Sequence, residues 1–250
     1  MKKAVLITGA SSGIGAATAK LFSQHGYFAY LLGRNEEHLT EVAIQCQHGA
    51  SLLRCDLNSE ASVIKYTQHL FERPDTDLQI LINNAGIFER TNHTSDGGSL
   101  STWRKQFDTN LFSAINITEK ILPLFMQKKK GSIVNVSSTL GLKPSADTAA
   151  YSASKAAMIN WTQSLAQELG PLQIRVNCVA PGIVDTPIHS FHHLKTEDKQ
   201  NVLNQLSPLQ PLQRIGNVDE IAQAIYFLGS EQSSWTTGAV LAVDGGINLV

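Results

Sequence analysis

This chain of 250 residues has few cysteines and almost no net charge. It has three cysteines, Cys46, Cys55 and Cys178, and a formal net charge of −1 at pH 7. The cysteines stand far apart, form no C-x-x-C pair and are odd in number, so we expect reduced thiols in a cytoplasmic protein. The near-zero charge excludes a global field that would recruit nucleic acid or an anionic membrane, so neither is an expected partner.

Long apolar runs are also missing. No stretch of 18 apolar residues exists, so no membrane span is expected. The N-terminal residues reach Gly9 before the apolar core of a secretory signal develops. The longest basic run, Lys128–Lys130, precedes a glycine, and this pattern is more typical of a solvated helix end than of a docking patch.

What the chain does contain is a regular alternation of short apolar runs with longer segments of helical period. The expected strands are 4–8, 27–33, 51–55, 78–83, 132–138, 174–182 and 239–246, and the expected helices are 13–26, 36–47, 59–72, 100–127, 149–170 and 221–230. This alternation predicts the α/β class: a three-layer, doubly wound parallel sheet of about seven strands with helices on both faces. We see no linker, so residues 1–250 are expected to form a single domain.

Two places depart from this rhythm. Pro123 is expected to bend or shorten the end of the helix over 100–127, because proline lacks the N–H that a helix needs. Segment 184–212 is rich in His, Gln and Pro and is long for a connection, so we expect it to cover a ligand as a variable lid.

A glycine-rich turn, TGASSGIG, follows the first expected strand. Gly9, Gly13 and Gly15 permit a tight turn and close approach of a ligand to the backbone. The helix that begins there offers unpaired N–H groups to a pyrophosphate, and Ser11 and Ser12 add hydroxyl donors. The alternative is a plain glycine-rich turn, but its place on the first strand favours dinucleotide binding.

The end of the second strand selects between the two nicotinamide cofactors. It ends in Gly33–Asn35 with no carboxylate at its tip, and Arg34 there can pair with a 2′-phosphate. We therefore expect NADP(H) to be preferred, with NAD(H) possible. In the alternative, Arg34 is a surface residue held by Glu36 or Glu37. Asp56, after the third strand, fits a bond to the adenine amino group or the cap of a turn.

The stretch YSASK places Tyr151 and Lys155 four residues apart, hence on one helix face. A free phenol has a pKa near ~10 and is a poor base at neutral pH. We expect the nearby ammonium to lower the pKa of Tyr151 into the range useful for general acid–base catalysis. The alternative is an exposed tyrosine and lysine at an ordinary helix start.

Together these motifs resemble the short-chain dehydrogenase/reductase family. The resemblance rests on TGASSGIG, NNAG (83–86), Asn110, SS (137–138), YSASK, PG (181–182) and the closing VDGG, in the family's order and spacing over essentially the whole chain. It implies a single Rossmann-type domain that transfers hydride between NAD(P) and a carbonyl or alcohol. The joint pattern is far more specific than the tyrosine–lysine pair alone.

The resemblance also assigns roles to individual residues. It implies a catalytic set of Asn110, Ser138, Tyr151 and Lys155. Ser138 would steady the substrate oxygen, and Lys155 would also hold the nicotinamide ribose. Asn110 would lie in a helix distortion whose main-chain carbonyl holds a water linked to Lys155, or it is a buried amide tying two helices.

The resemblance implies that the cofactor contacts residues at each strand end where a family motif lies. Asn83 is expected to tie strands, and the segment from Pro181 to bond the nicotinamide carboxamide, although Thr186 could instead cap a short helix. The full expected set is Gly9, Ser11, Ser12, Gly13, Ile14, Gly15, Arg34, Asp56, Leu57, Asn83, Ala85, Gly86, Tyr151, Lys155, Pro181, Gly182, Ile183 and Thr186.

Substrate contacts are expected from Ser138, Tyr151 and His189. His189 belongs to a cluster with His192 and His193 in the variable segment. Three histidines are compatible with zinc, but no strand or helix fixes their geometry and hydride transfer needs no metal, so none is expected.

The resulting hypothesis is an NADP(H)-preferring oxidoreductase of a small-molecule carbonyl/alcohol pair, resembling 3-oxoacyl-[acyl-carrier-protein] reductases. Those enzymes typically carry two basic groups for the carrier; Lys129 fits the first, but the second position is Leu172. A small ketone, sugar or cyclic alcohol is therefore an alternative substrate, and a non-catalytic NADP-binding redox sensor is the alternative of another class. The resemblance implies a homotetramer or homodimer, paired through the helices at 100–127 and 150–169 and again through the C-terminal strand.

Overall fold

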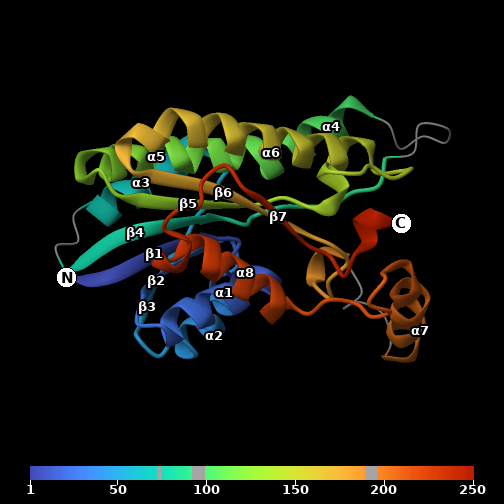
Figure 1. Ribbon diagram of the computed structural model, residues 1–250. Helices are drawn as coiled ribbons and strands as arrows, with labels where there is room; N and C mark the ends of the chain where they lie inside the picture. The colour runs from blue at the N-terminus through green and yellow to red at the C-terminus, as the bar shows by residue number, and fades with distance from the viewer. Residues whose placement is uncertain (72–74, 92–98, 190–195) are drawn as a thin grey trace.

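Seven strands form one parallel sheet in the order β3-β2-β1-β4-β5-β6-β7 (Figure 1). The computed structural model describes residues 1–71, 75–91, 99–189 and 196–250. The strands are β1 Lys2–Thr8, β2 Phe28–Gly33, β3 Ala50–Arg54, β4 Thr76–Asn83, β5 Gly131–Val136, β6 Ile174–Pro181 and β7 Val240–Val243. The predicted α/β class and doubly wound parallel sheet are therefore confirmed.

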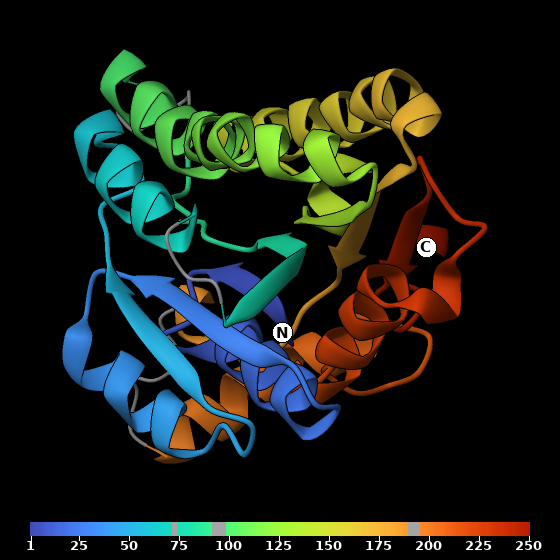
Figure 2. The same ribbon diagram turned by 90° about the vertical axis from the view of Figure 1, so that its left-hand side faces the viewer.

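Helices cover both faces of the sheet and make three layers (Figures 1 and 2). One face carries α1 Gly13–Gln24, α2 Glu36–Ile44 and α8 Val218–Gly229, and the other carries α3 Glu60–Phe71, α4 Leu100–Phe107, α5 Ser113–Lys128 and α6 Ala149–Leu169. The remaining helix, α7 Thr196–Leu206, lies beyond the sheet. Among the described helices, none combines the length and the apolar composition that a membrane span requires.

The core explains why the strands are continuous apolar runs. In β1, Leu6 packs into the cluster beneath α3, α5 and α6, while Val5 and Ile7 pack into the cluster beneath α1, α2 and α8. Each of these three side chains is fully buried. Because successive strand residues point to opposite faces, a strand covered on both faces needs an apolar residue at every position.

The chain reverses its direction of winding at β1. Ile7 pairs with Leu31 of β2 on one side and with Ile82 of β4 on the other. The connections that leave β1 and β4 therefore go to opposite faces of the sheet. Such a reversal opens a crevice at the carboxyl ends of the strands, where ligands bind in open α/β sheets.

Two expectations about the long helix at 100–127 need correction. A π-helical segment, Asp108–Phe112, divides it into α4 and α5. Pro123 lies inside α5, which continues to Lys128, so it does not shorten the helix. Pro123 is exposed, which leaves room for the local adjustment that its missing N–H requires.

One helix and one helix boundary also differ from the expectation. Segment 184–212 contains α7, which the reading of that segment as an irregular lid did not include. Helix α8 begins at Val218, three residues before the expected start. There Asn217 and Glu220 form a capping box, in which each side chain accepts from the other residue's N–H.

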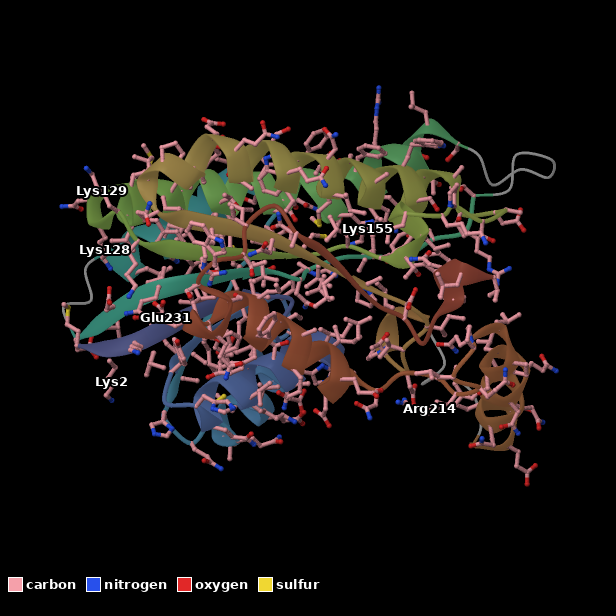
Figure 3. The ribbon with its side chains drawn as sticks, in the orientation of Figure 1. Lys2, Lys128, Lys129, Lys155, Arg214 and Glu231 are labelled. Carbon is pink, nitrogen blue, oxygen red and sulfur yellow. The ribbon has the colours of Figure 1, made fainter. Side chains whose placement is uncertain are left out.

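The basic run at the end of α5 is held by acidic partners. Lys128 bonds Asp77, and Lys130 pairs with Glu231 at 3.0 Å. Lys129 is the left-handed C-cap of the helix, with φ of 48°. Figure 3 shows Lys128 and Lys129 at the end of the molecule where α5 stops. The run is thus a capped helix end, as its position before a glycine predicts.

Arg175 in β6 fastens the end of α8 to the sheet. Its Nη1 donates to the carbonyl oxygen of Leu228 at 2.8 Å, and its Nη2 to those of Gly229 and Ser230 at 3.2 and 2.9 Å. These are carbonyls that the helix itself leaves without partners, at the negative end of its dipole. The guanidinium therefore satisfies the helix C-terminus from within the protein.

Replacing this guanidinium should destabilise the fold. We expect Arg175→Leu to lower the free energy of unfolding by about 3 kcal/mol, because several partly buried carbonyls each lose a charged donor, although Leu228 and Ser230 keep bonds from serine side chains. Urea unfolding followed by circular dichroism measures it. The control is Arg214→Leu, which breaks an exposed, solvent-screened pair with Glu220 and should cost clearly less. Equal losses in the two variants would contradict the role of Arg175.

Candidate active site

A cleft of about 760 Å³ lies at the carboxyl ends of the strands. Most of the predicted site residues line it: Gly9, Ser11, Ser12, Gly13, Ile14, Arg34, Asp56, Leu57, Ala85, Gly86, Ser138, Tyr151, Lys155, Pro181, Gly182, Ile183 and Thr186. This volume is ordinary for a cofactor with a small substrate.

The glycine turn packs directly on the loop that follows β4. Gly9 has φ of +65°, and a Cβ built on it would lie 2.9 Å from Cα of Ala85. A Cβ on Gly15 would lie 2.2 Å from the carbonyl oxygen of Gly9. Gly15 does not line the cleft; its missing side chain allows α1 to approach the turn, and its cofactor contact stays a prediction.

Asn84 and Thr8 lock these two loops together. The Asn84 side chain donates to the carbonyl oxygens of Thr8 at 3.0 Å and Gly9 at 3.3 Å. In return the Thr8 hydroxyl accepts from the backbone N–H groups of Asn84 at 2.9 Å and Ala85 at 3.1 Å. The sequence analysis missed both residues, although the doubled asparagine of NNAG was the available signal.

Asn83 points away from the cleft. Its side-chain amide donates to Thr118 at 3.0 Å and to Asn135 at 2.8 Å, and only 1% of its surface is exposed. The expectation that it ties strands agrees with this geometry, because Asn135 lies on the neighbouring β5. Asn83 is not among the residues that line the cleft, and its cofactor contact stays a prediction.

Arg34 lies exposed at the end of β2 and lines the cleft. Glu36 is 3.9 Å from Arg54 instead, and within the described part of the chain neither Glu36 nor Glu37 pairs with Arg34. The alternative of an arginine held by those acids is therefore not what the structure contains. Asp56 accepts from the N–H of Asn58 at 3.1 Å, so it caps a turn while also lining the cleft.

Three of the four expected catalytic side chains meet in the wall of the cleft. Tyr151, Lys155 and Ser138 are each less than a tenth exposed. Lys155 Nζ lies 5.8 Å from the centroid of the Tyr151 ring and donates to the carbonyl oxygen of Val136 at 2.9 Å. Ser138 Oγ accepts from the N–H of Leu140 at 3.1 Å, and its own proton can be donated to Tyr151 or to a substrate oxygen.

The pKa of Tyr151 moves opposite to the sequence-based expectation. Burial raises it to about 12, although a hydrogen bond with Ser138 lowers it. Burial also lowers the pKa of Lys155 to about 8, against a smaller opposing effect of the Cys178 thiol. The amine lies over the phenol ring and bonds Val136, and it is not among the causes that shift the pKa of Tyr151, so the cost of burying a phenolate decides the direction. At neutral pH the phenol is protonated and can donate.

Asn110 is fully buried in the π-helical segment and does not line the cleft. Its side chain donates to the carbonyl oxygen of Ile87 at 3.0 Å and to Ser154 at 3.1 Å, and accepts from the N–H of Ile87 at 2.8 Å. Both expected features are therefore present: a helix distortion, and an amide that ties neighbouring segments. The water bound by its main-chain carbonyl stays a prediction.

Comparisons with known proteins agree with this geometry. The sequence profile of a family described as enoyl-(acyl carrier protein) reductase matches residues 9–248. The 3-oxoacyl-[acyl-carrier-protein] reductase FabG of Chlamydia muridarum is 35% identical over 99% of this chain and 98% of its own. The cis-4-hydroxycyclohexanecarboxylate dehydrogenase of Sinomonas cyclohexanicum is 36% identical over 100% and 98%. The solved structure of ElxO with NADP bound superposes with a TM-score of 0.91, at 28% identity and full coverage of both chains.

The chain belongs to the short-chain dehydrogenase/reductase family. Its activity is accordingly that of an NAD(P)-dependent oxidoreductase acting on a carbonyl/alcohol pair.

In this family member, the segment after β6 forms one wall of the cleft. The N–H of Gly182 donates to the carbonyl oxygen of Val243 at 3.0 Å, and a Cβ on Gly182 would lie 2.7 Å from Cα of Asp244. Thr186 Oγ1 donates to the carbonyl oxygen of Val184 at 3.4 Å rather than capping a helix. His189 ends the short helix Pro187–His189, and its expected substrate contact lies outside the side chains that the structure describes.

Apolar side chains also line the cleft. The Phe88 ring meets the Tyr151 ring edge-on, with centroids 5.0 Å apart. The sequence analysis missed this set, which no motif marks: Phe88, Leu140, Ile188, Leu209 and Ile247. Among the described residues, no three His, Cys, Asp or Glu side chains gather as metal ligands. His192 and His193 lie outside those residues.

The buried amine should lower stability at neutral pH. Below pH 8 Lys155 is charged in both the folded and unfolded states, so the full burial penalty is present; above about 10.5 it is neutral in both and the penalty vanishes. We expect Lys155→Met to raise the free energy of unfolding at pH 7 by roughly 1–3 kcal/mol. The gain should shrink as pH rises from 8 to 10.5.

Chemical unfolding between pH 6 and 11 measures this difference. Lys129→Met is the matched control, because it removes an exposed lysine and should give no such pH-dependent gain. A destabilised Lys155→Met at pH 7, or a gain that does not depend on pH, would contradict the assigned cause.

Proposed function

We propose that the protein reduces the ketone group of a small molecule with NADPH as hydride donor. The observation that carries the proposal is the buried, protonated Tyr151 beside Ser138, in the same cleft as the glycine turn. The same arrangement serves the reverse oxidation when the phenol is deprotonated. Retention of both side chains, together with Lys155, argues against a non-catalytic redox sensor.

The glycine turn and Arg34 fit NADP(H). When bound, this cofactor supplies or accepts the hydride. Gly9 and Gly13 let the backbone approach a pyrophosphate, and the N-terminus of α1 begins at Gly13. Arg34 presents a guanidinium without an acidic partner among the described residues, as recognition of a 2′-phosphate requires. The NADP in the ElxO structure supports the same preference.

The proton moves through Tyr151. The phenol donates to the oxygen of the reduced carbonyl as negative charge develops there, and Ser138 holds that oxygen with its hydroxyl. Lys155, a cation beneath the ring at neutral pH, stabilises the phenolate that remains. Because burial raises the pKa of Tyr151 to about 12, the phenol carries its proton at neutral pH and can donate it.

A small ketone is favoured over an acyl chain on a carrier protein. Lys129 is exposed, but Leu172 packs against the hydrophobic core, so the second cation of a carrier-docking patch is missing at that position. The name of the Sinomonas relative shows that relatives at this identity include dehydrogenases of cyclic alcohols. The apolar side chains that line the cleft suit such a ring.

We also propose a homodimer or homotetramer in a reducing compartment. Leu100 and Phe112 are exposed on α4 and the segment after it, and Trp235 and Leu249 are exposed near β7 and the C-terminus. Large exposed apolar side chains on these segments support association through them. All three cysteines are free and buried, which fits a reducing compartment.

Loss of the Tyr151 hydroxyl should abolish turnover. We expect Tyr151→Phe to lower kcat for ketone reduction by at least about 100-fold, because a general acid contributes that much. NADPH consumption with a panel of cyclic and open-chain ketones measures it, and NADPH binding measured by fluorescence is the control for an intact site. Undiminished turnover in the variant would rule out Tyr151 as the proton donor.

The charge at position 34 should set the cofactor preference. We expect wild-type kcat/KM to favour NADPH over NADH, and Arg34→Asp to reverse that ratio by about 100-fold or more. Parallel assays with the two cofactors test it, with Arg54→Asp as a control because Arg54 does not line the cleft. A wild-type preference for NADH would show that the assignment of Arg34 is wrong.

A further inference from the structure

Arg90 is a second uncompensated guanidinium in the cleft, at the end remote from Arg34. It is exposed, and it lines the cleft next to Phe88. Within the described part of the chain it forms no ion pair. None of the family motifs includes this position, and the proposed reduction gives it no role.

The backbone on both sides of Arg90 is anchored. On one side, the Glu89 N–H donates to Gln106 Oε1 at 3.3 Å, and the Glu89 carbonyl oxygen accepts from Gln106 Nε2 at 3.1 Å. On the other side, the Thr91 N–H donates to the carbonyl oxygen of Asp147 at 2.8 Å. Thr91 Oγ1 also accepts from the N–H of Ala150, the residue before Tyr151, at 3.3 Å. Arg90 is therefore fixed relative to the helix that carries the proposed proton donor.

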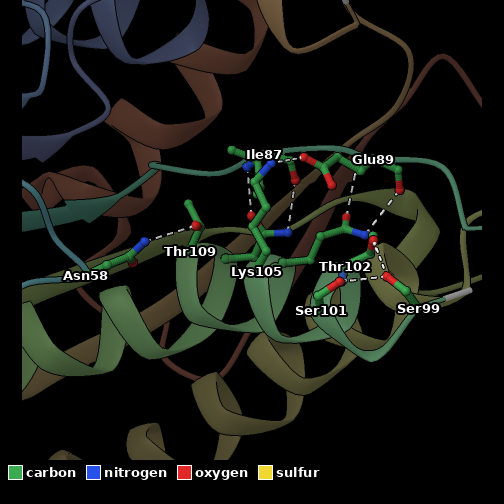
Figure 4. A network of polar contacts seen from close by, with 10 residues as sticks. Asn58, Ile87, Glu89, Ser99, Ser101, Thr102, Lys105 and Thr109 are labelled. Atoms are coloured by element: carbon green, nitrogen blue, oxygen red, sulfur yellow. Dashed lines mark hydrogen bonds and ion pairs between the residues drawn. The ribbon is translucent and has the colours of Figure 1, made fainter. Parts of the chain in front are cut away.

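Glu89, the acidic residue next to Arg90 in the sequence, already has its charge neutralised. Glu89 pairs with Lys105 of α4, and Figure 4 shows the two side chains joined on the α4 side of the segment. Asp147, whose carbonyl holds Thr91, forms no ion pair with Arg90. The charge that Arg90 brings to this end of the cleft is thus not cancelled by either carboxylate.

The surroundings of Arg90 make an anion the fitting partner. The cleft that Arg90 lines carries the apolar side chains of Phe88, Leu140, Ile188, Leu209 and Ile247, together with polar residues such as Glu89, Ser145 and Thr148. A planar guanidinium beside apolar surface binds a carboxylate through two parallel hydrogen bonds, which are roughly twice as strong as neutral ones. A ligand with an apolar ring or chain and one terminal carboxylate would contact both the apolar side chains and Arg90.

We infer that the substrate is an oxo acid, an apolar ring or chain that carries a ketone at one end and a carboxylate at the other, and that Arg90 binds the carboxylate. This assignment rests on the proposed ketone reduction. Arg90 takes no part in proton or hydride transfer; it determines which ketones are held with their carbonyl at Ser138 and Tyr151.

Paired substrates test the inference at low ionic strength, where an exposed ion pair is least screened. The pairs are 4-oxocyclohexanecarboxylate and 7-oxooctanoate, each with its methyl ester, which keeps the shape and removes the charge. We expect the wild type to prefer at least one acid over its ester by about 10-fold or more in kcat/KM, mainly through KM. In Arg90→Gln the ratio of acid to ester should fall towards one, and Arg90→Lys should recover part of it.

Arg104→Gln is the matched control, because it removes an exposed arginine of α4 that does not line the cleft and should keep the ratio. A wild type without preference for either acid, or an unchanged ratio in Arg90→Gln, would overturn the inference.

A binding measurement separates this inference from the proposed function. In the NADPH complex of Tyr151→Phe, calorimetric titration with the same acids and esters gives dissociation constants that do not depend on turnover. The acid should bind about 10-fold more weakly once Arg90→Gln is added. If the wild type reduces no ketone of the panel, the proposed function fails, while equal acid affinities with and without Arg90→Gln overturn the role of Arg90 alone.

Discussion

The burial of the Lys155 amine under the Tyr151 ring is the constraint on which the site depends. An amine without water must find its partners in the protein, and here it bonds the Val136 carbonyl at the end of β5. The neighbours leave space for it: a Cβ on Gly86 would lie 3.4 Å from Nζ, and one on Gly141 would lie 2.8 Å from the Lys155 carbonyl carbon. Burying this cation destabilises the folded state, but it places the Lys155 amine beside the Tyr151 phenol.

The position of that cation follows from the winding of the sheet. The crevice forms where the connections leaving β1 and β4 diverge, and the Thr8–Asn84 bonds hold its two edges at a fixed separation. Ser138 follows the end of β5, and α6 carries Tyr151 and Lys155 at the same edge of the sheet. The cleft therefore joins the proposed dinucleotide site at the glycine turn to the place where Phe88 meets the phenol. Arg34 and Arg90, which have no acidic partner among the described residues, are the groups that we propose bind the anionic parts of cofactor and substrate.

The residues foreseen from sequence were those whose chemistry a local pattern specifies. Tyr151 and Lys155 share a helix face because of their spacing, and Gly9 stands in a turn that needs positive φ. Asn83 and Gly15 belong to the motifs but do not line the cleft, because a motif does not tell a contact from a support. Phe88 and Arg90 went unnoticed, since a substrate pocket assembled from several loops has no pattern along the chain.

The sequence by itself determined the alternating α/β architecture, the glycine turn and the residues able to exchange a proton, because periodicity and side-chain chemistry are local properties. Only the tertiary structure decided the direction of the Tyr151 pKa shift. That shift depends on how many atoms exclude water from the phenol, and those atoms come from segments distant along the chain. The tertiary structure likewise decided that Glu89 pairs with Lys105 and that Arg90 has no acidic partner among the described residues, since charge compensation depends on which side chains the fold brings together.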